Sequence, residues 1–92
     1  MEIGHALKIC RSAKKLSLDE LAERAGLSQS YLSMIESGKR EPTLSSIDKV
    51  AKALGVPTPI ILFLASDKGE LQGLDEETTN RLSAVVLEIV RA

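Results

Sequence analysis

Two short amphipathic segments joined by a glycine turn constrain this chain most strongly. Ser17 followed by Glu20 is a capping-box pattern, which predicts a helix that runs to about Ala25. Gly26 then supplies the positive φ angle that ends a helix and turns the chain sharply. Ser28 follows as a cap for the next helix. The sequence therefore predicts two helices that meet across a tight turn.

The same periodicity runs through the rest of the chain, because apolar residues recur at three and four positions rather than at two. Helices are predicted at about 3–15, at 28–37 before Gly38, at 44–54 between Thr43 and Gly55, after Thr58-Pro59 as a cap and first-turn proline, and from a cap at Asp75 nearly to Ala92. No segment is convincing as a strand. We expect an all-α fold, a compact five-helix bundle with an additional C-terminal helix, divided into residues 1–67 and a linker with the last helix at 68–92.

Length and composition limit the class of protein. Ninety-two residues form one small domain, and 43% hydrophobic with 27% charged residues is typical of a folded rather than a disordered chain. Cys10 is the single cysteine, so no disulfide within the chain is expected. The longest apolar run, at 60–65, is far shorter than the roughly 20 residues that span a bilayer. These features predict a soluble, cytoplasmic protein without a membrane contact.

Charge is distributed unevenly along the chain. The net charge is -1, which by itself does not favour a nucleic-acid partner. Through Lys68, however, ten Lys and Arg stand against eight Asp and Glu, a net charge of +2, whereas from Gly69 onward two stand against five, a net charge of -3. Basic and acidic functions are therefore predicted to lie in different parts of the chain.

The stretch LSLDELAERAGLSQSYLSMIESGKREPTLSSIDKVAKALGV closely resembles the helix-turn-helix domain of the phage lambda repressor and Cro type, also called the XRE family. The resemblance spans roughly Ile3 to Leu64 and includes the spacing, the turn glycine Gly26 and the IESGKREPTL segment. It implies a lambda-repressor-like fold and a regulator, encoded by a bacterium or phage, that binds double-stranded DNA and is nucleoid-associated when bound. Some of the type examples of this docking geometry are members of the same family.

The resemblance also implies which side chains meet DNA. Base reading is expected from the positions that face the groove in the family's recognition helix, Gln29, Ser30, Ser33 and Met34. Gln29 is the best reader, because its amide both donates and accepts and can bind adenine N6 and N7 together. Serines read less selectively, and the thioether of Met34 can only lie against a thymine methyl group.

Phosphate contacts are expected from backbone N–H groups near Leu18 and from Ser28, Tyr31, Lys39 and Arg40. Two of these assignments have plainer alternatives, since Tyr31 could cover the edge of the core and Lys39-Arg40 could be a solvated loop. Arg11 and Glu36 resemble a family pair that links the first and third helices by a salt bridge.

The last helix is expected to mediate a twofold homodimer. Its apolar residues recur at helical spacing and, with two residues of the fifth helix, give the predicted interface Ile61, Leu64, Leu82, Val85, Val86, Ile89 and Val90. The alternative is that this helix folds back on its own chain and enlarges the core.

The sequence offers no chemistry for an enzyme. It has no Walker A loop, dinucleotide fingerprint or metal-ligand spacing, and His5 has no triad partners, so no catalytic residue, cofactor or metal is expected. A homodimeric repressor at a palindromic operator is the leading hypothesis. Two alternatives stay open, an antitoxin-type protein that binds a toxin partner and autoregulates its operon, and a restriction-modification controller protein.

Overall fold

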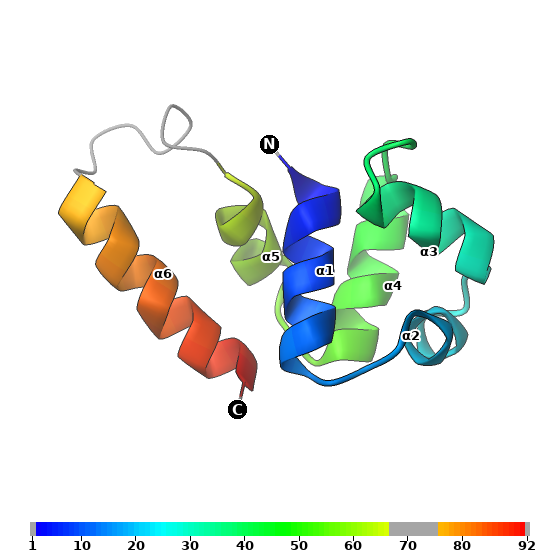
Figure 1. Ribbon diagram of the computed structural model, residues 1–92, viewed down its shortest axis with the longest axis horizontal. Helices are drawn as coiled ribbons and strands as arrows, with labels where there is room; N and C mark the ends of the chain where they lie inside the picture. The colour runs from blue at the N-terminus through cyan, green and yellow to red at the C-terminus, as the bar shows by residue number, and fades with distance from the viewer. Residues whose placement is uncertain (1, 67–75, 92) are drawn as a thin grey trace.

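The computed structural model describes residues 2–66 and 76–91, apart from the side chains of residues 76, 78, 79 and 89. Within these ranges the protein has six helices and no strand, as the sequence predicts, and Figure 1 shows their arrangement. The helices are α1 (Ile3–Ala13), α2 (Leu18–Ala25), α3 (Gln29–Glu36), α4 (Leu44–Leu54), α5 (Thr58–Ala65) and α6 (Glu76–Arg91). The predicted linker at 68–73 and the predicted cap Asp75 lie outside the described residues.

Local caps explain where most of these helices begin. The hydroxyls of Ser17, Ser28 and Thr43 each accept a hydrogen bond from the backbone N–H three residues later, at 3.0–3.1 Å. Glu20 returns the contact by accepting the Ser17 N–H at 3.0 Å, which completes the predicted capping box. Gly26 has the predicted left-handed conformation, with φ at 70°.

Two helix boundaries differ from the sequence prediction. Helix α1 ends at Ala13 rather than at Lys15. The chain turns at Lys15, which has the left-handed conformation (φ 57°) that glycine usually adopts at the end of a helix. Thr58 is the first residue of α5 and not its cap. Its hydroxyl instead donates to Oδ1 of Asp48 in α4 at 2.7 Å, a partner that local sequence does not reveal.

The core lies where α1, α4 and α5 meet, and α2 and α3 close one side of it. Its largest fully buried side chains come from all six helices: Leu7, Cys10, Leu21, Leu32, Ile35, Val50, Ile61 and Val90. Ala22 of α2 is also buried in this core. The helix pair α2–α3 is thus fixed to the body of the protein through its inner face.

Helix α6 packs against α1, at the end of the molecule opposite α3 (Figure 1). Val86 and Val90 are buried, and Ile61 of α5 is fully covered in the same core. These three members of the predicted interface thus pack within the single chain, which corresponds to the alternative of a helix folded back on its own core. Leu64 is half-buried, and the side chain of Ile89 lies outside the described residues.

Two members of the predicted interface stay uncovered. Leu82 is 40% exposed and Val85 57% exposed, although both are large apolar side chains. The contact with a partner stays a prediction. The exposed apolar surface that is available for this contact is the part of α6 around Leu82 and Val85.

Candidate nucleic-acid interface

The outer face of α3 carries the predicted base-reading residues. Gln29, Ser30 and Ser33 are exposed, and Met34 is half-buried beside the buried Ile35. Gln29 and Ser30 are the first two residues of the helix, immediately after the cap. The amino-terminal end of α3 therefore presents two polar side chains to solvent while Leu32 and Ile35 hold the helix to the core.

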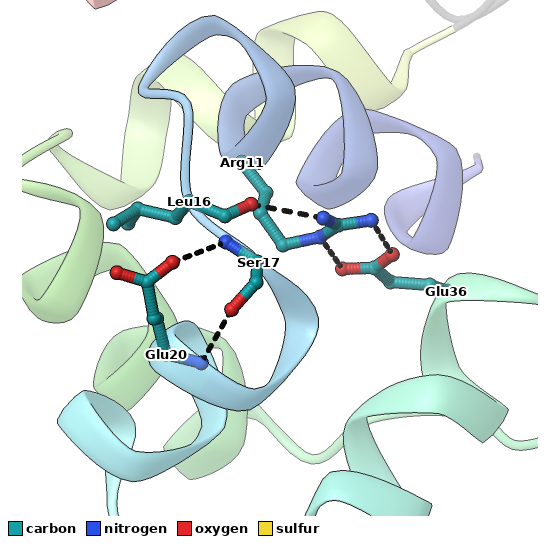
Figure 2. Close-up of polar contacts among 5 residues, drawn as sticks. All are labelled: Arg11, Leu16, Ser17, Glu20 and Glu36. Atoms are coloured by element: carbon teal, nitrogen blue, oxygen red, sulfur yellow. Dashed lines mark hydrogen bonds and ion pairs between the residues drawn. The ribbon is translucent and has the colours of Figure 1, made fainter.

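A two-pronged ion pair holds α3 against α1 (Figure 2). Arg11 donates from Nε and Nη2 to the two carboxylate oxygens of Glu36 at 2.9 and 3.0 Å, and from Nη1 to the carbonyl of Leu16 at 3.0 Å. The side chains are only 17% and 7% exposed. Hydrogen bonding to Glu36 raises the pKa of Arg11, so its guanidinium stays charged. One side chain thus joins α1, the turn before α2 and the end of α3.

Gly4 is a second contact between α1 and α3, and sequence reasoning missed it. A Cβ atom at Gly4 would overlap the carbonyl oxygen of Ile35 and lie 3.1 Å from that of Glu36. The backbones can therefore approach only because this residue has no side chain. The available signal was a glycine inside an apolar helical pattern, which often marks a close approach.

Tyr31 links α3 to α4. Its hydroxyl lies 3.0 Å from Oγ of the buried Ser46, which also accepts a hydrogen bond from Thr43 at 2.9 Å. The hydrogen bond with Ser46 lowers the pKa of Tyr31. The architectural alternative for Tyr31 thus has a direct contact to support it, and its role at a phosphate stays a prediction.

The loop after α3 brings its basic residues back toward the helix. Lys39 and Arg40 are exposed, and their backbone N–H groups both donate to the carbonyl of Met34, at 2.9 and 3.2 Å. The guanidinium of Arg40 lies 5.1 Å from the centre of the Tyr31 ring, within cation–π range. Two cationic side chains therefore flank the carboxyl end of α3.

A small hollow of about 250 Å³ joins α1, α2 and α3. It brings together Leu18, at the amino end of α2, and Ser33 of α3, which the sequence assigned separately to phosphate and base contacts. Exposed Lys8 of α1 also lines it. Lys8 was not among the predicted DNA contacts, because the sequence placed it only on the polar side of its helix.

The described residues show no metal site, since no three His, Cys, Asp or Glu side chains cluster among them. Cys10 is fully buried, and this burial raises the pKa of its thiol, which disfavours the reactive thiolate. His5 is exposed on α1. Within the described ranges, none of the helices combines the length and the apolar character that crossing a bilayer requires.

Comparison with known families identifies this arrangement. The family model described as "Helix-turn-helix" matches residues 7–61, from α1 to the start of α5, and so includes the capped turn and α3. The chain belongs to the Cro/C1-type helix-turn-helix family, also called XRE. This family and the all-helical fold are those predicted from the sequence.

Several relatives of this XRE-family protein are named as transcriptional regulators or repressors. It is 42% identical over 62 residues to an immunity repressor protein of Bacillus phage phi105, covering 67% of this chain and 43% of the repressor. It is 40% identical over 80 residues to the HTH-type transcriptional regulator SinR of Bacillus licheniformis, covering 85% and 71%. Some relatives are much longer, since a regulator of Sinorhizobium fredii is matched over only 26% of its length.

Two solved structures share the fold of this XRE-family protein. The restriction-modification controller protein C.AhdI of Aeromonas hydrophila is 37% identical with a TM-score of 0.64, over 65% of this chain and 91% of that protein. The clp gene regulator ClgR of C. glutamicum is 33% identical with a TM-score of 0.68, over 79% and 92%. The helix-turn-helix therefore has the same structural setting in proteins of regulatory function.

Proposed function

We propose that this XRE-family regulator is a sequence-specific, homodimeric repressor that inserts α3 into the major groove of a palindromic operator. The observation that carries this proposal is the exposure of Gln29, Ser30 and Ser33 on an α3 whose inner face is buried and whose far end is held by Arg11. A rigid helix with polar side chains at its amino end is what groove reading requires. The immunity repressor of Bacillus phage phi105 supports repression as the regulatory outcome.

In this proposal, base reading and positioning fall to different residues. Gln29, Ser30 and Ser33 read base edges, and Met34 contacts a thymine methyl group at the border of the core. Lys39, Arg40, Ser28, Tyr31 and the backbone at Leu18 hold the phosphates. Lys8 joins this second group, because it shares a hollow with Leu18 and Ser33.

Replacing Gln29 and Lys39 separates the two roles. Gln29→Ala should lower specific binding by about 1–3 kcal/mol and leave non-specific binding nearly unchanged, because one bidentate base contact is lost. Lys39→Ala should weaken both kinds of binding and reduce the slope of log K against log[salt] by roughly 1. The measurement is fluorescence anisotropy with a duplex selected from random sequence and with a scrambled duplex, at several salt concentrations.

The matched control for Lys39→Ala is Arg81→Ala, which removes the same charge from α6, at the opposite end of the protein. It should leave the salt slope unchanged. Equal losses for Gln29→Ala on both duplexes would contradict the assignment of Gln29 as a base reader.

The homodimer is proposed to form through residues 68–92, with Leu82 and Val85 of α6 meeting their copies. Two recognition helices could then enter successive major grooves about 34 Å apart. Val85→Glu should shift the protein toward monomer in sedimentation equilibrium at micromolar concentration, because it places a charge on the uncovered apolar surface. Ala84→Glu, also exposed on α6, is the control. A wild-type protein that is monomeric at that concentration would contradict the proposal.

A restriction-modification controller is the second candidate, because the likeness to C.AhdI extends over 91% of that protein. Such a regulator would act on tandem sites and activate as well as repress. Footprinting distinguishes the two candidates, since protection of two adjacent operators favours the controller and a single palindrome favours the repressor.

A further inference from the structure

A groove of about 790 Å³ runs between α1 and α6, away from the outer face of α3. Its floor is apolar and comes from both helices, Ile9 and Ala13 of α1 and Leu87 of α6. The side of α6 that carries Val86 and Val90 is buried against the core. Leu87 is only half-buried and lies at the groove. The volume falls within the range of roughly 300–1,000 Å³ that small-molecule sites occupy.

The rim of this groove is cationic. Three cationic side chains line it, Lys8, Lys15 and Arg91, together with the imidazole of His5. Among the described residues, no Asp or Glu lines the groove with them. Like charges gathered around an apolar floor repel one another in the empty groove, so a ligand with a negative charge and an apolar body would relieve the repulsion and cover the floor.

We propose that this groove binds an aliphatic carboxylate of medium chain length as an effector. The carboxylate pairs with Lys8, Lys15 or Arg91, and the alkyl chain lies on Ile9, Ala13 and Leu87. The groove follows α1 from His5 to Ala13, which is roughly 12 Å of helix and suits a short alkyl chain. A DNA phosphate would satisfy the rim but would leave the apolar floor uncovered.

Lys8 connects this groove to the proposed DNA face. It lines the groove and also the hollow that contains Leu18 and Ser33. A bound carboxylate would draw the ammonium group of Lys8 away from a phosphate at that hollow. Ligand binding should therefore weaken DNA binding. This effect on DNA rests on the proposed function, whereas the existence of the ligand site does not depend on it.

The first experiment uses no DNA. Decanoate, kept below its micelle-forming concentration, is titrated into the ¹⁵N-labelled protein, and amide shifts are followed. We expect saturable shifts at Ile9, Ala13 and Leu87, and about tenfold weaker binding of decanol, which lacks the charge, and of butyrate, which lacks the tail. Shifts elsewhere, no saturation, or equal binding of decanol would overturn the proposal.

Two variants test the groove directly. Leu87→Glu places a carboxylate on the floor and should abolish decanoate binding, whereas Ala84→Glu, exposed on the same helix, should retain it. Lys15→Gln, at an exposed rim position, should weaken binding without altering the floor. Retention of binding in both Leu87→Glu and Lys15→Gln would overturn the site.

Other occupants of the groove have their own signatures. Cosedimentation with anionic lipid vesicles but no response to dissolved decanoate would identify a membrane surface and overturn the proposal. If the protein forms a dimer that Leu87→Glu dissociates but decanoate leaves intact, the occupant of the groove is a second copy of the chain. That result would also overturn the proposal.

The second experiment measures the link to DNA. Decanoate should raise the Kd for a duplex several-fold in the wild type and leave it unchanged in Leu87→Glu. A protein that binds decanoate in the groove but no duplex would contradict the proposed function and leave the ligand site standing. A Kd that decanoate does not change would overturn the role of Lys8 as the link.

Discussion

Arg11→Ala is expected to lower the free energy of unfolding by about 3 kcal/mol, because it strands the carboxylate of Glu36 in a largely buried position. The same change removes the hydrogen bond to the carbonyl of Leu16. For a domain of this size the loss is a large share of a total of roughly 5–15 kcal/mol. Urea unfolding followed by circular dichroism measures it as a lower midpoint with an unchanged slope.

The chain contains a matched control for this variant. Arg81 pairs with Glu77 at 2.8 Å, but both side chains are more than three-quarters exposed. Arg81→Ala should therefore change stability by less than about 1 kcal/mol. If Arg11→Ala is as mild as Arg81→Ala, the ion pair does not hold α3 in place. Arg11→Lys should recover only part of the loss, because lysine lacks the planar fork that contacts both oxygens.

Gly4→Ala is expected to destabilise the protein by about 1–3 kcal/mol, although alanine favours helices. Its Cβ atom would overlap the carbonyl oxygen of Ile35, and a backbone atom cannot move aside without displacing the end of α3. Binding of a specific duplex should fall in parallel, since α3 carries the proposed base readers. Thermal unfolding and anisotropy measure the two effects.

Ser12→Ala, at an exposed position of the same helix, is the control and should be neutral or slightly stabilising. A Gly4→Ala protein that is more stable than the wild type and binds DNA normally would show that α1 and α3 do not need this close approach.

Features with local causes were predictable from the sequence. The capping box at Ser17 and the turn at Gly26 involve residues at most five positions apart, so the pattern contains all the information needed. The exposed face of α3 was also predictable, because Leu32 and Ile35 mark its opposite side. These elements define the helix-turn-helix, which is why the sequence alone resembles the family.

Features that depend on distant partners were not predictable from local spacing, and the Arg11–Glu36 pair was expected only through the family resemblance. Thr58 forms a hydrogen bond with Asp48, Tyr31 forms one with Ser46, and Gly4 packs on α3. The spacing of nearby residues does not indicate any of these partners. The apolar stripe of α6 has the same limit, because periodicity shows that a face is buried but does not show which surface buries it. Val86 is covered by the protein's own core while Val85 beside it is exposed.

Amide shift mapping of the labelled protein with a short duplex at low salt tests most directly whether α3 is the surface that meets DNA. The largest changes should fall at Leu18, Gln29, Ser30 and Ser33, and the residues of α6 should change little. Changes concentrated on α5 and α6, with Gln29 and Ser30 unaffected, would contradict the claim that α3 is the surface that meets DNA.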